Sequence, residues 1–110
     1  MLTRDAFLSA AKPAVVDVQV PALGGSAQIR EMTVSDKDAF EIANAKDKGK
    51  YWRPRLVAAS VVNPDGSPMF GPADFPALAA LPASSLEPIV DAATKLNRYT
   101  PEEVKALEGN

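Results

Sequence analysis

Residues 46–55, KDKGKYWRPR, include the side chains best suited to bind a partner through charge. Five of the twelve cations of the chain lie in this segment, on both sides of Tyr51 and Trp52. Cations beside aromatic rings can bind phosphates while a base stacks on a ring, as in proteins that bind single-stranded nucleic acids. The structural alternative is a solvated linker leading into a helix whose Trp52 packs inward, and this is the simpler interpretation.

The charge of the whole chain argues against nucleic acid as the partner. Twelve basic and fourteen acidic side chains give a net charge of −2, and the pI is about 5.0. Nucleic-acid affinity depends largely on a broad basic surface that neutralises phosphates, which this composition does not supply. A small nucleic-acid-binding module that uses residues 46–55 therefore stays the alternative function.

Enzymatic chemistry has little support in this sequence. The chain has no histidine and no cysteine, so it lacks the commonest general base, a catalytic thiol and the usual zinc ligands. The serines have no histidine to activate them, and none lies in a G-x-S-x-G motif. The carboxylates do not form a calcium loop, and Gly24-Gly25 opens no phosphate-binding helix. We predict a non-enzymatic protein without a metal or cofactor.

The composition is that of an ordinary globular domain. Hydrophobic residues make up 46% of the 110 residues and charged residues 24%. The start of the chain, MLTRDAFLSAAKP, has charges and no long apolar core, so we do not expect a signal peptide. The apolar run at residues 56–62 is too short to span a membrane. We expect a cytoplasmic protein.

A β-hairpin is predicted in the first third of the chain. Valines alternate with polar residues over residues 15–20, which is the period of a strand with one solvated face. Gly24-Gly25 suits a loop that needs positive φ, and residues 27–32 are predicted to return with Ile29 facing inward. Before the hairpin, Thr3 is predicted to cap a helix over residues 4–11 that docks as a lid.

Two helices are predicted after the hairpin. Ser35 can cap the first of them, in which Phe40 and Ala43 face inward and Ile42 is a further candidate for that face. Pro54 suits the first turn of the second. Residues 56–62 are compatible with either a helix or a strand, and we prefer a helix with the last two residues extended. Residues 63–68 then form a turn.

Further helices are predicted near the end of the chain. Asp74 can cap a short helix that carries Phe75, Leu78 and Leu81. Ser85 is predicted to cap the next helix, in which apolar residues recur on one face: Leu86, Ile89, Val90, Ala93 and Leu96. A last helix begins at the capping sequence Thr100-Pro101-Glu102-Glu103, and its thin apolar face makes it marginal in isolation.

These elements predict an α+β fold in which an N-terminal β-hairpin packs on about four short helices. Residues 1–97 form a single globular domain in this prediction, and residues 98–110 form a short, mobile helical tail. The predicted core consists of Val16, Val18, Ile29, Phe40, Leu56, Val57, Leu78, Leu86, Ile89, Val90 and Leu96.

The order of segments over about residues 15–97 is more informative than any one segment. A valine-rich strand is followed by PALGGSAQIREMTVSDKDAFE, RLVAASVVNPDGSPMF and FPALAALPASSLEPIVDAATKLN. The pattern combines Leu-Gly-Gly, Arg-Glu-Met-Thr, a turn with Asp-Gly, and a helix start Leu-Pro-x-x-x-Leu-Glu-Pro. It resembles the tail assembly chaperones of long, flexible-tailed bacteriophages and related prophages. The proline-rich residues 71–76 depart from the pattern, since similar chains more often begin that helix with polar residues.

The resemblance implies a non-enzymatic protein made in the cytoplasm of the bacterial host. Such proteins bind the tape measure protein, help recruit tail tube subunits around it, and are absent from the finished virion. Self-association into rings or spirals is also implied. In many of these phages a ribosomal frameshift near the end of the gene adds a second domain to a minority of copies.

Two places in the sequence are candidates for the partner-binding surface. A tape measure protein is a long chain with apolar helical faces, so its chaperone needs apolar surface with a charged rim. Trp, Tyr and Arg are frequent interface anchors, and the first candidate consists of Tyr51, Trp52, Arg53 and Arg55. The second consists of Phe70 and Phe75 on a stiff, proline-rich segment. We prefer the first because its cations can also meet acidic partner residues.

Overall fold

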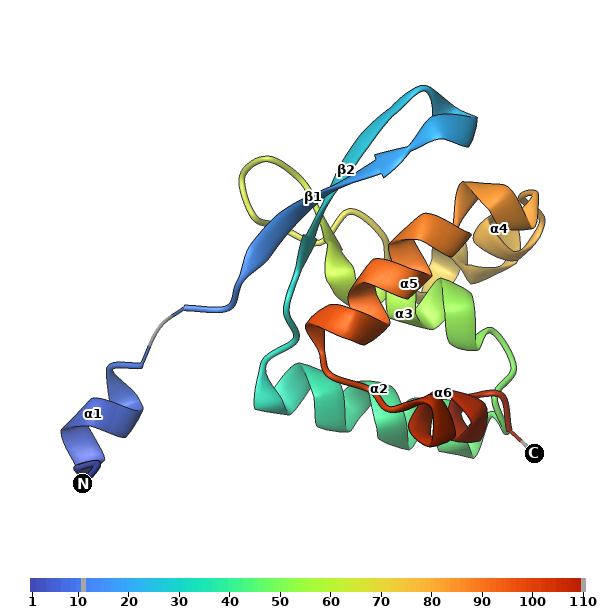
Figure 1. The fold of residues 1–110 in the computed structure, drawn as a ribbon. Coiled ribbons are helices and arrows are strands. Elements are labelled where there is room, and N and C mark those ends of the chain that lie inside the picture. Colours follow the sequence, from blue (N-terminus) through green and yellow to red (C-terminus); the bar gives the residue numbers. More distant parts are fainter. Residues whose placement is uncertain (11, 110) are drawn as a thin grey trace.

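The computed structural model describes residues 1–10 and 12–109 and has the predicted α+β architecture. A three-stranded antiparallel sheet with the order β1-β2-β3 lies over layers of helices (Figure 1). Helices α3 and α5 contact each other beneath the hairpin, and α2 and α6 lie below them. In chain order the elements are α1 (Arg4–Leu8), β1 (Val15–Val20), β2 (Gly25–Arg30), α2 (Val34–Lys46), α3 (Trp52–Ser60), β3 (Val61–Val62), α4 (Phe75–Ala79), α5 (Glu87–Leu96) and α6 (Pro101–Leu107).

The hairpin is present, with its return strand two residues earlier than predicted. Strands β1 and β2 pair from Val15 opposite Arg30 to Val20 opposite Gly25. The loop is a 3-10 turn, Pro21–Leu23, closed by Gly24 with φ 69°. Only one left-handed residue is needed, so the second glycine already belongs to β2.

The burial of the hairpin side chains changes along the edge strand β1. Ile29 on the central strand is fully buried, as predicted, and pairs with Val61 of β3. On the same face of β1, Val20 is buried, Val18 is half-buried and Val16 is 39% exposed. The prediction that Val16 belongs to the core is therefore wrong, because the helices cover this edge strand only toward the tip of the hairpin.

Helix α2 begins two residues earlier than predicted because Thr33, not Ser35, is its N-cap. The Asp36 backbone N–H donates to the Thr33 hydroxyl at 3.1 Å, and the Thr33 backbone N–H donates to the Asp36 carboxylate at 3.4 Å. This capping box satisfies two backbone donors at once. Phe40 is buried, as the helical pattern predicts, whereas Ile42 is 70% exposed, so its inward placement is wrong.

The preferred assignment for residues 56–62 is confirmed. Helix α3 continues to Ser60, and Val61–Val62 is extended as β3. The turn over residues 63–68 is closed by two backbone hydrogen bonds of 2.8 Å, from Asn63 to the Ser67 carbonyl and from Gly66 to the Asn63 carbonyl. The chain then pairs back on β3 through Val62 and Pro68.

Two helix caps differ from the prediction. The Asp74 carboxylate accepts a hydrogen bond of 2.9 Å from the Gly71 backbone N–H, so it closes the 3-10 turn Pro72–Asp74 instead of capping α4. Ser85 is buried in another 3-10 turn, Ala83–Ser85, and its side chain does not cap α5. In both places a 3-10 turn leads directly into the helix, so no separate cap is needed.

The packing of the two terminal helices is the reverse of what the sequence predicts. Thr3 caps α1 as predicted, but every residue over 1–10 is exposed and α1 stands clear of the body (Figure 1), so a docked lid is wrong. The last residue of the predicted helix, at position 11, lies outside the described residues. At the other end, α6 packs on α2 and buries Leu107, in contrast to a separate tail. Residue 110 of that predicted tail also lies outside the described residues.

The core gathers side chains from the sheet and from five helices. All predicted members are buried or half-buried except Val16. The buried hydrophobic residues that the prediction left out are Val20, Met32, Trp52, Val61, Val62, Phe75, Ala93 and Leu107. Asn97 joins the layers, since its side-chain oxygen accepts from the Met32 backbone N–H and its amide donates to the Ala93 carbonyl, both at 2.9 Å.

Candidate functional site

The predicted partner-binding segment begins in a connection between α2 and α3 whose charged side chains are exposed, as expected, but whose backbone is tightly turned. Lys48, Gly49 and Tyr51 all have positive φ, at 55°, 80° and 61°. Gly49 is buried, and a Cβ atom added there would lie 2.5 Å from the carbonyl carbon of Glu108. The end of α6 therefore packs on this connection and fixes where α3 begins.

Trp52, the first residue of α3, belongs to the core. Its side chain is 7% exposed, so it has little surface to offer a partner. The guanidinium carbon of Arg53 lies 4.6 Å from the centroid of the Trp52 ring and covers it on the outside. The simpler interpretation of this segment, that Trp52 packs inward, is the one the structure supports.

The side chain of Arg55 is also bonded to other residues of the same molecule. Its guanidinium donates to the Asp47 carboxylate and, at 3.1 Å, to the Lys50 carbonyl oxygen. The same group lies 5.1 Å from the centroid of the Phe75 ring, and the Tyr51 ring is 6.1 Å from that ring. These contacts hold α4 against the start of α3, so the charge of Arg55 is already balanced.

The six predicted partner-binding residues thus fall into three groups. Tyr51, Arg55 and Phe75 form one packed cluster, and Trp52 with Arg53 forms a second contact beside it. Phe70 is half-buried and lines a different hollow of the surface. The structure therefore does not bring the two candidate places together as one exposed patch.

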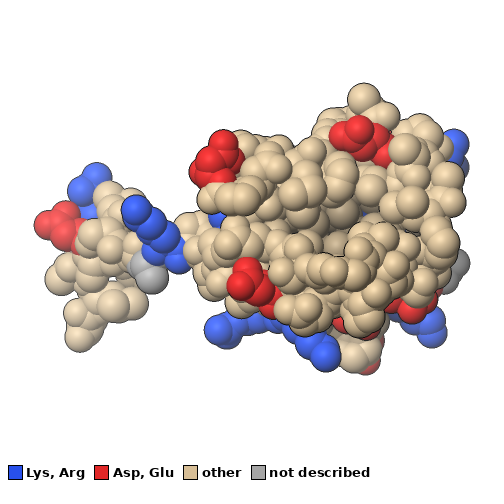
Figure 2. Space-filling model, turned by 90° about the horizontal axis from the view of Figure 1, so that it is seen from above, with Lys and Arg blue, Asp and Glu red and all other residues tan. Residues whose placement is uncertain are grey.

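A further surface was missed by the sequence prediction, and we call it the hairpin groove. It is a hollow of about 280 Å³ between the hairpin, the chain after β3, and helices α4 and α5. Val57, Val61 and Ile89 belong to its lining, and none of the described residues that line it is charged. Figure 2 shows this face of the molecule. The hollow is lined by uncharged residues, and the charged side chains lie nearer the edges of the face.

Three exposed apolar side chains stand on the rim of the hairpin groove. Leu23 comes from the hairpin loop, Met69 from the chain after β3, and Leu81 from the chain just after α4. Leu23 is 62% exposed and Leu81 is 42% exposed. An apolar groove with an apolar rim is a typical docking surface for another protein.

The hairpin groove continues toward the predicted segment. A second hollow, of about 370 Å³, is lined by Tyr51, Trp52 and Arg53 on one side. Leu78, Leu81 and Leu86 line both hollows. Arg53 therefore lies near the groove and offers it an exposed cation, although its neighbour Trp52 is buried.

No known protein family, curated protein or solved structure matches the chain. The function of the site is therefore inferred from its own residues and from the sequence pattern over about residues 15–97.

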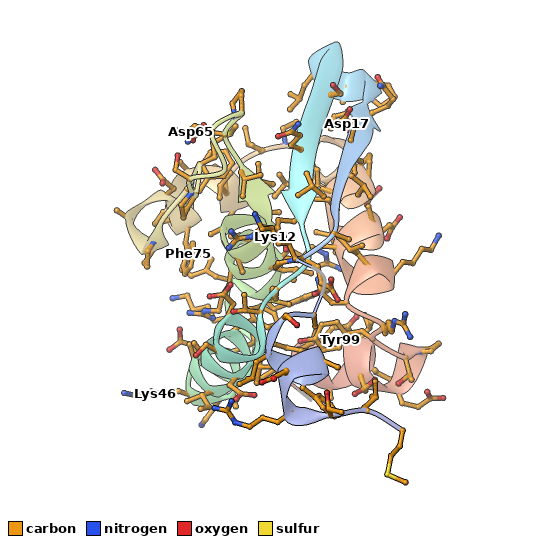
Figure 3. All side chains as sticks on the ribbon, turned by 90° about the vertical axis from the view of Figure 1, so that its left-hand side faces the viewer. Lys12, Asp17, Lys46, Asp65, Phe75 and Tyr99 are labelled. Atoms are coloured by element: carbon orange, nitrogen blue, oxygen red, sulfur yellow. The ribbon has the colours of Figure 1, made fainter. Side chains whose placement is uncertain are left out.

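The titratable groups with shifted pKa values have structural roles. Burial, and then the hydrogen bond of 2.6 Å from its hydroxyl to the Glu41 carboxylate, raise the pKa of Tyr99, which lies between α5 and α6 (Figure 3). Hydrogen bonds from the Ser67 hydroxyl and backbone N–H lower the pKa of Asp65 in the turn after β3. Burial and hydrogen bonds explain the shift of Tyr99, and hydrogen bonds within the turn explain that of Asp65.

The described residues also limit other kinds of site. Over residues 1–10 and 12–109, acidic side chains nowhere gather in a group of three or more that could hold a metal ion. None of the helices in the same part of the chain has the length and apolar character that crossing a bilayer requires.

Proposed function

We propose that this chain is a non-enzymatic tail assembly chaperone of a long, flexible-tailed phage or prophage. In this proposal the hairpin groove binds a helical segment of the tape measure protein, and the chaperone helps to recruit tail tube subunits in the host cytoplasm. The sequence pattern over about residues 15–97 supports the identity of the partner. The observation that carries the proposal is the uncharged groove with Leu23, Met69 and Leu81 on its rim.

The dimensions and chemistry of the groove suit one face of an amphipathic helix. Such a helix presents apolar side chains at positions i, i+3, i+4 and i+7, and these can enter an apolar groove while its polar face stays in water. A hollow of about 280 Å³ accommodates a few such side chains. A charged side chain in this uncharged lining would lose its hydration without gaining a partner. The groove therefore selects apolar helical faces, which a tape measure protein has before assembly.

The alternative function, nucleic-acid binding through residues 46–55, gains no support from the geometry. Stacking of a base needs an exposed aromatic ring, and Trp52 is buried under Arg53. Arg55 is paired with Asp47. Tyr51, whose ring lies beside Phe75, is half-buried. We therefore do not propose it.

The proposal is tested by co-expression of the chain with the long helical protein encoded beside it. The wild-type chain should co-purify with that protein and keep it in solution. The substitution Leu81→Asp places a carboxylate on the groove rim, and we expect it to weaken capture by about tenfold or more, as burial of an unpaired charge is costly. Because Leu81 is 42% exposed, the fold should tolerate the change.

The matched control is Ile42→Asp, which makes the same kind of change at an exposed apolar residue of α2 outside the groove lining. It should leave capture unchanged. Capture through an apolar groove should also persist when salt is raised, whereas binding to nucleic acid falls steeply with salt. Equal capture by wild type and Leu81→Asp would exclude the hairpin groove as the docking surface.

A further inference from the structure

The N-terminal arm, residues 1–9, is a segment with apolar side chains that no other part of the same molecule covers. Four of its side chains are large and apolar and all are exposed: Met1, Leu2, Phe7 and Leu8. Its helix α1 has only five residues, and helices this short are marginal in water without packing. The arm stands clear of the body at one end of the molecule (Figure 1). Both observations indicate that the arm needs an apolar surface elsewhere.

The length of the chain limits how far Leu8 of the arm can reach toward the hairpin groove of its own molecule. Ala14 is fixed beside Glu31, whose backbone N–H donates to the Ala14 carbonyl at 2.8 Å and whose carboxylate accepts from the Ala14 N–H at 3.2 Å. Strand β1 then runs away from the arm, and its six residues span about 20 Å before the groove begins at Val20.

Only five residues separate Leu8 from Ala14. A chain of that length extends at most about 20 Å, even with no residue used for a turn. Doubling back at Ala14 requires a turn, which uses several residues and shortens the reach well below the length of β1. Leu8 therefore cannot enter the groove between Leu23 and Leu81 of the same molecule, whereas a second molecule has no such restriction.

We propose that the N-terminal arm of one copy docks in the hairpin groove of a second copy. The apolar side chains Phe7 and Leu8 match a groove of about 280 Å³ whose described lining carries no charge. The cap defines where the helix begins, since the Ala6 backbone N–H donates to the Thr3 hydroxyl at 3.2 Å, and docking supplies the packing that so short a helix lacks.

The distribution of charge also favours this occupant. The arm, residues 1–9, carries one cation and one acidic side chain, and the remaining residues carry eleven cations and thirteen acidic side chains. The arm is therefore neutral and the body weakly acidic, so arm-to-body contact between copies avoids the repulsion that opposes body-to-body contact.

This inference goes beyond the proposed function, because the groove has an occupant within the same protein. An arm seated in the groove covers its apolar lining when no partner is present. A partner helix must then displace the arm, so partner binding and arm exchange compete for one surface.

The experiment measures the mass of the full chain by sedimentation over a concentration series up to about 1 mM, where even a very weak contact is visible. The arm variant carries Phe7→Asp and Leu8→Asp, and the groove variant carries Leu23→Asp and Leu81→Asp. All four positions are exposed, so both variants should fold. Wild type should associate with rising concentration, and each variant alone should stay monomeric.

Mixing the two variants gives the decisive result. The arm variant keeps an intact groove and the groove variant keeps an intact arm, so their mixture should form a one-to-one complex with twice the monomer mass. The control Ile42→Asp should associate like wild type. A monomeric wild type over the whole series, or association that survives in either variant alone, would overturn the inference. Capture of the tape measure protein by the arm variant should be unchanged or stronger, so the two proposals fail separately.

Discussion

The two ends of the chain carry similar short helices that behave in opposite ways. Helices α1 and α6 have five and seven residues, and each begins at a threonine whose hydroxyl accepts a backbone hydrogen bond. Residues 1–10 are all exposed, whereas α6 buries Leu107 and places Val104 against the core. A cap sets where a short helix begins, but it does not decide whether that helix packs.

Backbone contact is what distinguishes α6 from α1. The Asn44 amide of α2 donates to the Leu107 carbonyl at 2.9 Å, and this bond is buried. Next to it, Gly49 lies so close to Glu108 that no side chain fits between them. A helix with two apolar residues can thus dock firmly when a glycine lets the backbones approach. The arm has more apolar surface but no such contact on its own body, so it remains available to another molecule.

The largest expected effect on stability comes from Gly49→Ala, which places a side-chain atom between the two backbones. The new Cβ atom would lie 2.5 Å from Glu108 at a residue with φ 80°, so both a clash and backbone strain oppose it. We expect a loss of about 3 kcal/mol in the free energy of unfolding, because relief requires α6 to move off α2. Urea unfolding measures the loss, and hydrogen exchange should show α6 loosened first.

The control for this substitution is Gly24→Ala. Gly24 also has positive φ, at 69°, but the space around it is open. Its cost should be only that of the left-handed backbone, about 1 kcal/mol. Equal losses in the two variants would mean that the contact between Gly49 and Glu108 contributes nothing to docking of α6.

The second prediction compares one leucine from each terminal helix. Leu107→Ala removes a side chain that is 6% exposed and should cost about 2–3 kcal/mol, since a buried leucine leaves a cavity. Leu8→Ala removes an exposed side chain and should change the free energy of unfolding by less than about 0.5 kcal/mol. Both are measured by urea unfolding at a protein concentration low enough to prevent association. A similar loss in both variants would contradict the packing difference.

Much of the fold follows from local pattern. The alternation of valines predicts β1, the Asn-Pro-Asp-Gly turn predicts the connection after β3, and the capping sequence at Thr100 predicts the start of α6. Errors of one or two residues in the start of a helix arise where two neighbouring residues are both suitable caps. Thr33 and Ser35 are both good caps, and only the reciprocal bond with Asp36 decides for Thr33.

The long-range features could not be predicted because their parts are far apart in sequence. The hairpin groove combines residues from β1 and its loop, α3 and β3, and the ends of α4 and α5. One local signal does exist, because Leu23 is a large apolar residue in a tight turn between Pro21 and Gly24, where water is the usual neighbour. Trp52 was assigned to the partner-binding surface for the opposite reason, since Trp is a frequent interface anchor and is also highly buried in protein cores. Residue type alone does not decide which.

The smallest expected effect is a difference in pH dependence between the N-terminal caps of the two terminal helices. Hydrogen bonds from the backbone N–H and then the hydroxyl of Thr100 lower the pKa of Glu103 below its ordinary value of 4.5. A carboxylate with a lowered pKa in the folded state stabilises the fold above its unfolded pKa, and this contribution is lost as the pH falls through the folded pKa. In α1 the corresponding position is Ala6, so its cap has no such dependence.

Replacing Glu103 by Gln keeps a side chain that can accept the bond from the Thr100 N–H but removes the titration. Between about pH 3 and pH 6, which brackets an ordinary glutamate pKa, the urea midpoint of wild type should fall toward acid more steeply than that of Glu103→Gln. Glu102→Gln, which removes a neighbouring carboxylate outside the capping box, is the matched control. If Glu103→Gln and wild type have the same slope, the charge of Glu103 does not stabilise α6, which is then held by Leu107, the bond from Asn44 and the contact with Gly49.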